Sequence, residues 1–450
     1  MFHDERDAEV ESPPNLCGVT SARFCAQFGL IDTFENESDT LSTGEAFDVI
    51  IFKSADNQYF QNSEFQVYFN GRQANRPRNG GSVSDSRASA FASRIVMEIR
   101  RGESTTWIPI ERLNRNRMQS DGTLKDDTSP HSSSDGSPSC TCCRLNMSKS
   151  ILPFSPGLTI DGVESTKNED ECAISRALAD FLLPGRNPVR YLLLGKRDKG
   201  KIVGVARANI FLWSYKDRFI VCDIDGTITK SNAVGIFDTL WTENYQQCHD
   251  GVCQLLTSLS HKTQARMIYV TSRPISLASA TRRFLENLSQ NRGSACLPHG
   301  PLLGFGGTFQ QLLTMELFTK STYQFKSGVL LNQVVKPYLR ASSSSTSSMN
   351  KCAETPMFRA GFGNTYMDVQ AYHMAGIHLN NIFLINKQSA LVVFDQASEK
   401  GGYAEGAEQC MSDVDSPKTR KWYEERVRST FKGYTDVRLV DHVLGEATRF

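Results

Sequence analysis

The stretch FIVCDIDGTIT at residues 219–229 constrains the fold more than any other part of the chain. An apolar run ends there in Asp223 and Asp225, which predicts two carboxylates at the carboxyl edge of a sheet, where open α/β sheets bind ligands. Apolar strand-like runs then alternate with helical stretches such as 275–289. This alternation is typical of a doubly wound sheet, so the sequence predicts an α/β domain that begins near residue 217.

The two carboxylates are suited to divide the steps of phosphate ester hydrolysis. Asp223 is the predicted nucleophile toward phosphorus, and Asp225 is the predicted acid that protonates the leaving oxygen and then the base that activates water. Gly226 lets the backbone approach a phosphate, and Thr227 and Thr229 are predicted to hydrogen-bond around it. A purely structural acidic turn is the alternative, but the apolar lead-in and the trailing Gly-Thr favour chemistry.

Two later elements carry groups that would bind the phosphate. The apolar run MIYVTSR at 267–273 leads to Thr271, whose hydroxyl is a donor for a phosphoryl oxygen. Lys326 in STYQFKSG is the candidate that neutralises the nucleophile and the phosphate. Strand-end threonines are usually turn or N-cap residues, and the residues alone do not separate Lys326 from Lys320 or Lys336.

The fourth element, FRAGFGNTYMD, places oxygen donors after another apolar stretch. Asn364 and Asp368 have the G-N-x-x-x-D spacing expected near Mg²⁺, which prefers oxygen ligands. With a carboxylate oxygen of Asp223 and the backbone carbonyl of Asp225, they would complete or orient the shell of the ion. A glycine turn with an N-capping asparagine is the alternative for this element taken alone.

In this order, the four elements resemble the haloacid-dehalogenase-type phosphatases with a DxDxT motif. A longer likeness is to the lipins, the magnesium-dependent phosphatidic acid phosphatases, and it begins in ANIFLWSYKDRFIVCDIDGTITKSNAVG. Near the N-terminus, AFDVIIF and SEFQVYF resemble the lipin N-terminal homology region. Further lipin-like segments follow in the same order: CLPHGPLL at 296–303, FRAGFGNTYMDVQAY at 358–372, LNNIFLINKQSAL at 379–391 and VRLVDHVL at 437–444.

The resemblance implies a peripheral enzyme that hydrolyses phosphatidic acid to diacylglycerol through an aspartyl-phosphate, with Mg²⁺ as cofactor. It implies an anionic membrane surface as partner and a cytoplasmic location on the endoplasmic reticulum or nuclear envelope. Gly226, Ser272 and Arg273 would bind the substrate, with Arg273 facing its head group. The chain departs from the lipin pattern at Glu45-Ala46, where lipins have Gly-Ala, and at Thr365, where lipins usually have arginine.

Composition shifts predict several regions along the chain. Strand-like runs predict one hairpin within 46–69, a strand at 95–99 and a second hairpin formed by 189–194 and 202–213. The N-terminal strands cannot close a core alone, and the resemblance implies that they form an immunoglobulin-like β-sandwich with the later hairpin. The predicted organisation is an amphipathic helix at 14–37, a lipin-like β region at 45–113, a disordered linker at 114–150, strands at 186–216 and a catalytic domain at 217–445 with inserts at 341–355 and 399–433.

Two amphipathic patterns are candidates for membrane contact. The first is the apolar face of residues 16–34, and the second is a basic helix expected over 418–432, with Tyr423, Val427 and Phe431 in one stripe. Packing on the protein's own domain is the alternative for both. The sequence does not decide between these alternatives.

The composition excludes some function classes. Fifty basic residues and forty-nine acidic residues give a net charge of +1, so no global field recruits nucleic acid or an anionic membrane, and any such attraction must come from a local patch. The N-terminus lacks a secretory pattern and no apolar run is long enough to span a bilayer, which predicts a soluble or peripheral protein. The twelve cysteines are scattered, as expected of reduced thiols; the oligomeric state is left open.

Other functions compete with the lipid phosphatase. A related phosphatase could act on a soluble or protein phosphate, because fold and nucleophile do not specify the leaving group. A non-catalytic module that binds phosphatidic acid is the alternative from another class, and the presence of both Asp223 and Asp225 argues against it. A nuclear co-regulator finds little support in the sequence.

Overall fold

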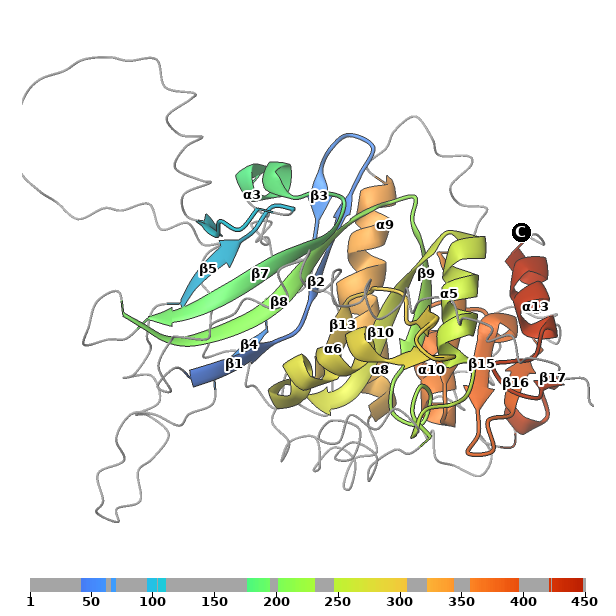
Figure 1. The fold of residues 1–450 in the computed structure, drawn as a ribbon. Coiled ribbons are helices and arrows are strands. Elements are labelled where there is room, and N and C mark those ends of the chain that lie inside the picture. Colours follow the sequence, from blue (N-terminus) through green and yellow to red (C-terminus); the bar gives the residue numbers. More distant parts are fainter. Residues whose placement is uncertain are drawn as a thin grey trace, which may run out of the picture.

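The computed structural model describes residues 42–61, 66–69, 95–102, 104–110, 176–194, 201–230, 247–305, 322–343, 357–395, 421 and 423–447. The helix expected at 14–37 and the linker expected at 114–150 lie outside these residues, as do most of the two expected inserts. Two large sheets lie side by side in the described part of the chain (Figure 1). None of its helices has both the length and the apolar character needed to cross a membrane.

The α/β region is built on a seven-stranded sheet with the order β13-β10-β9-β14-β15-β16-β17. Its strands from β13 to β15 are parallel, whereas β16 and β17 are antiparallel to their neighbours. The strands are β9 (Arg218–Asp223), β10 (Ala265–Pro274), β13 (Leu302–Phe305), β14 (Phe358–Gly363), β15 (Ile382–Ile385), β16 (Leu391–Phe394) and β17 (Val427–Phe431), and a separate small hairpin pairs β11 (Ser289–Gln290) with β12 (Ala295–Cys296).

Helices cover both faces of this sheet, as a buried parallel sheet requires. Along β9, Ile220 and Cys222 belong to the apolar cluster on one face, and Phe219 and Val221 to the cluster on the other. The first cluster includes residues of α5 (Val252–Thr263), α6 (Ala278–Asn287) and α13 (Arg438–Ala447), and the second includes residues of α8 (Thr322–Leu330), α9 (Lys336–Ser343) and α10 (Tyr366–Met374). The predicted α/β class is therefore confirmed.

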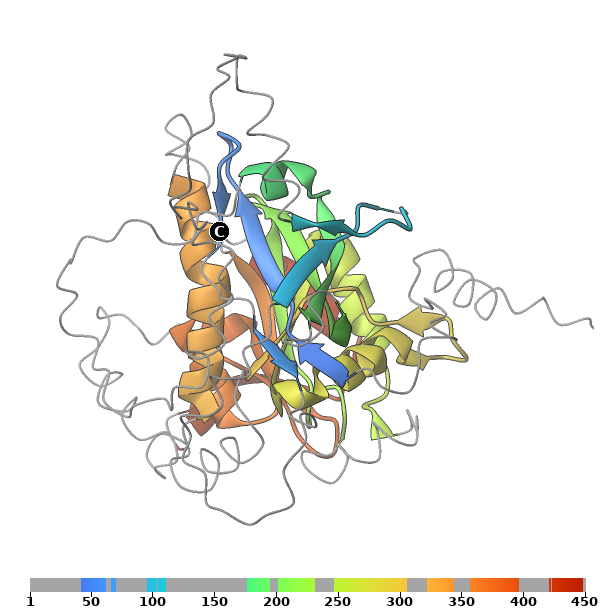
Figure 2. The ribbon, with the colours of Figure 1, turned by 90° about the vertical axis from the view of Figure 1, so that its left-hand side faces the viewer.

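The connections contain short helical turns. The π-helical turn η6 (Leu331–Val335) joins α8 and α9 into one long helix, drawn in orange in Figures 1 and 2. The 3₁₀ turns η4 (Ile275–Leu277) and η7 (Leu379–Asn381) precede α6 and β15.

The second sheet has eight strands, and it combines N-terminal strands with those that precede β9 (Figure 2). Its main order is β3-β2-β8-β7-β5-β6, and β1 pairs with both β4 and β8. The elements are β1 (Ser42–Ala46), β2 (Val49–Lys53), β3 (Tyr59–Phe60), β4 (Val67–Phe69), β5 (Ile95–Ile99), β6 (Ile108–Pro109), the helix α3 (Arg176–Phe181), β7 (Gly185–Leu194) and β8 (Ile202–Ser214). The N-terminal strands β1 and β2 thus pair with β8, in the same sheet as the strands that precede β9.

The segment between β1 and β2 joins the two sheets. Oδ1 of Asp48 accepts hydrogen bonds from the backbone N–H of Asn209, at 2.7 Å, and from Nη2 of Arg282, at 3.1 Å. Its Oδ2 accepts the backbone N–H of Leu302 on β13, at 2.9 Å. Phe47 packs against Gly304, where an added Cβ would lie 2.2 Å from the phenyl Cζ. The N-terminal segment is thus part of the packing of the α/β region.

Two expectations about secondary structure are corrected. The helix expected over 418–432 is wrong for its second half, because Val427–Phe431 is strand β17, paired with β16 at the edge of the sheet. The last residues of the expected insert 399–433 therefore belong to the sheet. In the expected hairpin within 46–69, β2 pairs with β3, whereas Val67–Phe69 pairs with β1.

Candidate active site

The predicted site residues meet where three neighbouring strands end. Because β10, β9 and β14 are adjacent and parallel, their carboxyl ends lie together at one edge of the sheet. Asp223 is the last residue of β9, Thr271 lies near the end of β10, and Asn364 directly follows β14. The structure thus brings together groups that are far apart in the sequence.

The turn after β9 holds the predicted nucleophile through Thr227. The hydroxyl of Thr227 donates to Oδ2 of Asp223 at 3.1 Å, and both residues are buried. Gly226 adopts a φ of 80°, a left-handed conformation that favours glycine. Its N–H donates to Oγ1 of Thr229 at 3.1 Å, so the turn is closed by its own side chains.

Lys326 on α8 bridges two buried carboxylates. Its Nζ lies 2.7 Å from Oδ1 of Asp223 and 2.5 Å from Oδ1 of Asp368. Burial raises the pKa of Asp223, and the nearby Asp368 also raises it, while the charge of Lys326 opposes both. Burial tends to lower the pKa of Lys326, but the two carboxylates outweigh it, so the pKa lies above its ordinary value and the amine stays charged.

Asp368 is held by the first turn of α10. Thr365 is the N-cap of this helix: its hydroxyl donates to Oδ2 of Asp368 at 2.8 Å, and the backbone N–H groups of Thr365 and Asn364 donate to the same oxygen at 3.0 and 3.1 Å. Burial acts to raise the pKa of Asp368, but Lys326 and these hydrogen bonds hold it below its ordinary value. The sequence contains this signal as T-x-x-D before a helix, although comparison with the lipin pattern marks Thr365 only as a departure.

Arg273 binds the carboxylate of Asp225, the predicted acid, in this structure. Its Nε and Nη2 lie 2.9 and 2.6 Å from the two carboxylate oxygens of Asp225, and Nη1 donates to Thr281 on α6 at 3.2 Å. Only 1% of the Arg273 side chain is exposed. The expected contact with a substrate head group stays a prediction, as does that of the half-buried Ser272. Thr271, also buried, accepts the backbone N–H of Arg273 at 3.0 Å.

The charges of this cluster fit a divalent cation. Asp225 is paired with Arg273, but Asp223 and Asp368 share one lysine, so this buried cluster carries one negative charge in excess when both carboxylates are ionised. The remaining predicted ligand of the metal is the half-buried Asn364. All the predicted ligands therefore offer oxygen atoms, which Mg²⁺ prefers. Among the described residues, no three His, Cys, Asp or Glu side chains cluster closely enough to hold a metal by themselves.

Comparison with known proteins gives a family and several curated relatives. The model of the LNS2 (Lipin/Ned1/Smp2) family matches residues 174–414. "Nuclear elongation and deformation protein 1" of Schizosaccharomyces pombe is 33% identical over 208 residues, which are 46% of this chain and 28% of that protein. "Phosphatidic acid phosphohydrolase 1" of Saccharomyces cerevisiae is 28% identical over 300 residues, 65% of this chain and 32% of that protein.

A human relative, "Phosphatidate phosphatase LPIN1", is 33% identical over 189 residues, 41% of this chain and 18% of that protein. The chain thus aligns with at most 32% of the length of each of these three relatives. The family match includes Asp223, Lys326 and Asp368, and it ends before β17.

Proposed function

Because the chain belongs to the LNS2 (Lipin/Ned1/Smp2) family, we propose that it hydrolyses phosphatidic acid to diacylglycerol and phosphate. The observation that carries this proposal is the buried cluster in which Lys326 bridges Asp223 and Asp368 while Thr227 holds the second oxygen of Asp223. The relatives named as phosphatidate phosphatases support the choice of substrate.

The proposed reaction has two steps at one carboxylate. An oxygen of Asp223 attacks phosphorus, the bond from phosphorus to the glycerol oxygen breaks, and Asp225 gives that oxygen a proton. Asp225 enters this step in its protonated form, and not as the carboxylate that is paired with Arg273 in this structure. Asp225 then takes a proton from a water molecule that attacks the aspartyl-phosphate, which releases phosphate and restores Asp223. Gly226, Thr271 and Ser272 are the proposed contacts for the phosphoryl oxygens.

The proposal includes Mg²⁺ held by Asp223, the backbone carbonyl of Asp225, Asn364 and Asp368. When bound, the ion would supply positive charge against the negative charge of the phosphoryl group. It would also offset the excess carboxylate that Lys326 leaves in this buried cluster. The donor set, made only of oxygen, supports magnesium over softer metals.

A peripheral position on an anionic membrane is part of the same proposal, since phosphatidic acid lies in a bilayer. The cytoplasmic face of the endoplasmic reticulum or nuclear envelope is the proposed place. The strands β1 to β8 are proposed to belong to an immunoglobulin-like fold.

The test is phosphate release from phosphatidic acid in detergent micelles, with and without Mg²⁺. We expect release by the native chain with Mg²⁺, and loss of release in Asp223→Asn and Asp225→Asn. Asp56→Asn, which changes an exposed carboxylate in the turn after β2, is the matched control. Activity in Asp223→Asn equal to that of the control would refute the proposed nucleophile.

The same assay separates the alternatives. Release from a soluble phosphate ester but not from phosphatidic acid would favour a phosphatase of another substrate. Binding to phosphatidic acid vesicles without any release would favour a non-catalytic lipid-binding module.

A further inference from the structure

The turn that contains the predicted nucleophile motif is anchored by two side chains from outside the motif. Nε2 of His249 lies 3.4 Å from the carbonyl oxygen of Gly226, and the hydroxyl of Tyr434 donates to the carbonyl oxygen of Thr227 at 2.9 Å. Both side chains are buried, and their rings are in edge contact with centroids 6.0 Å apart.

These two contacts complete the hydrogen bonding of the peptide groups on either side of Thr227. The N–H groups of the same two peptide units belong to Thr227 and Ile228. Both donate to the carbonyl oxygen of Ile224, at 3.3 and 2.9 Å. Each of the two peptide planes is therefore held at both ends. Since these planes flank the Cα of Thr227, they set the direction of its side chain, which donates to Asp223.

His249 is itself fixed from several directions. Its Nδ1 lies 2.7 Å from Oγ of Ser389, its backbone N–H donates to Ile228 at 2.9 Å, and its carbonyl accepts from Gln290 at 2.8 Å. Because a carbonyl oxygen only accepts, the contact with Gly226 assigns the hydrogen of the neutral ring to Nε2, and Nδ1 then accepts from the serine hydroxyl. Burial lowers the pKa of His249, which favours this neutral form.

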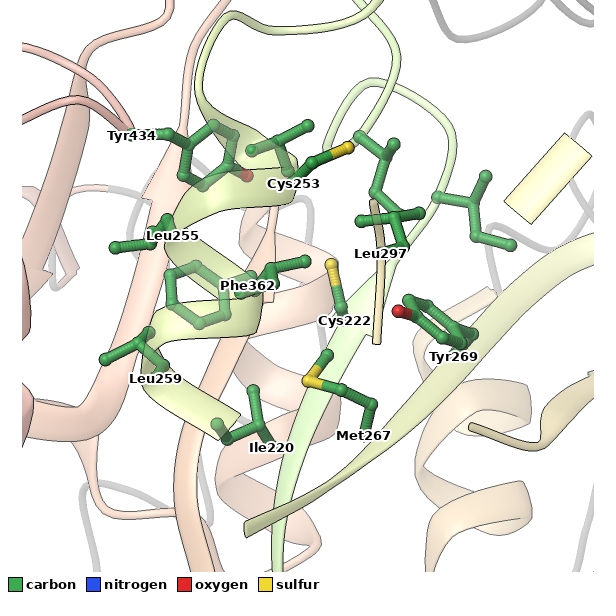
Figure 3. Close-up of a cluster of buried hydrophobic side chains, with 14 of the residues drawn as sticks. Ile220, Cys222, Cys253, Leu255, Leu259, Met267, Tyr269, Leu297, Phe362 and Tyr434 are labelled. Atoms are coloured by element: carbon green, nitrogen blue, oxygen red, sulfur yellow. The ribbon is translucent and has the colours of Figure 1, made fainter. Parts of the chain in front are cut away.

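Tyr434 is fixed by packing and follows β17. Its ring lies beside Phe362 of β14, with centroids 6.1 Å apart, and Figure 3 shows the two residues next to each other. Burial raises the pKa of Tyr434, so the phenol keeps the hydrogen that it donates. The residue lies beyond the family match at 174–414, so that the match does not include it.

We propose that His249 and Tyr434 are positioning residues: by fixing the peptide groups around Thr227, they hold its hydroxyl on the carboxylate of Asp223. The inference rests on the proposed role of Asp223 as nucleophile. It does not depend on which phosphate ester the protein hydrolyses, because neither side chain is assigned a contact with the leaving group.

The test measures the nucleophile without turnover. Beryllofluoride bonds to an aspartate oxygen in the place of a phosphoryl group, and its fluorine resonances report the adduct in the presence of Mg²⁺. We expect an adduct with the native chain that is lost in Asp223→Asn, and about tenfold weaker binding in Tyr434→Phe, which leaves a buried carbonyl without its donor.

Tyr269→Phe is the matched control. Tyr269 is also a buried tyrosine, its hydroxyl donates to the carbonyl of Pro298 at 2.7 Å, and in Figure 3 it lies on the opposite side of Cys222 from Tyr434. We expect this variant to lose thermal stability without losing affinity for beryllofluoride. For His249, the glutamine variant keeps a donor near the position of Nε2 and is expected to bind more tightly than the asparagine variant.

The outcomes separate this inference from the proposed substrate. Equal affinities in Tyr434→Phe and Tyr269→Phe would overturn it, and so would a native chain that forms no adduct, because no nucleophile would then be positioned. An adduct that depends on Tyr434, in a chain that leaves phosphatidic acid intact, would support the inference and refute the substrate.

Discussion

Arg273 forms a two-point ion pair with Asp225, in which Nη2 lies 2.6 Å from Oδ1 and Nε 2.9 Å from Oδ2. A planar guanidinium matches both oxygens at once, whereas the ammonium of lysine is a point charge. The side chain that the sequence assigned to a head group therefore fixes the rotation of the predicted acid.

Replacement of this arginine should lower the turnover number more than it raises KM. In Arg273→Lys we expect kcat to fall about 10- to 100-fold, since charged hydrogen bonds are lost on the predicted acid, Asp225. Arg266→Lys, at a side chain that is 54% exposed, is the control and should retain activity. A raised KM with unchanged kcat would instead support the head-group contact.

Thr365 should stabilise α10 through its capping box. Thr365→Ala removes the hydroxyl bonded to Asp368 and should lower the free energy of unfolding by about 1 kcal/mol. Thr365→Ser keeps the hydroxyl and is the matched control in denaturant titration. If the alanine and serine variants unfold at the same denaturant concentration, the cap contributes nothing.

The contact between Phe47 and Gly304 should limit the size of residue 304. Gly304→Ala places a methyl group against the phenyl ring and should destabilise the fold by about 1–3 kcal/mol. Gly328→Ala is the control, because nothing lies within 4 Å of an added Cβ and alanine favours helix α8. In a double-mutant cycle, Phe47→Ala should remove part of the penalty of Gly304→Ala; strict additivity of the two changes would argue against direct contact.

The stability contributed by Glu45 should depend on pH. Glu45 accepts the backbone N–H of Ser279 at 2.6 Å, yet burial raises its pKa above the ordinary 4.5. A raised pKa means that folding favours the protonated form, so this contribution is present at low pH and is lost as the pH rises through the folded-state pKa.

Glu45→Gln keeps an oxygen that can accept from Ser279 and removes the buried charge. We expect a higher melting temperature than that of the native chain at pH 8, with the difference shrinking as the pH approaches 4. Thermal unfolding across this range is the measurement. A variant less stable than the native chain at pH 8 would show that the charge of Glu45 stabilises its contact with Ser279.

The sequence by itself determined the strand that ends at Asp223, the α/β class and the neighbouring strand ends that meet there. These follow from local apolar runs and their order, because a buried parallel strand needs continuous apolar residues and a polar carboxyl end. Local pattern also predicted the pairing of β7 with β8, where two apolar runs flank a short polar turn.

Tertiary structure decided the contacts between residues far apart in the chain. Residues 427–431 have helical apolar spacing, yet they form β17, because pairing with β16 satisfies their backbone and buries Phe431. Tyr434 reaches the carbonyl of Thr227 across 207 residues of sequence. No local pattern contains such a contact, since it exists only after the sheet and its helices have packed; the sequence therefore supplied the reactive groups, and packing determined which side chains orient them.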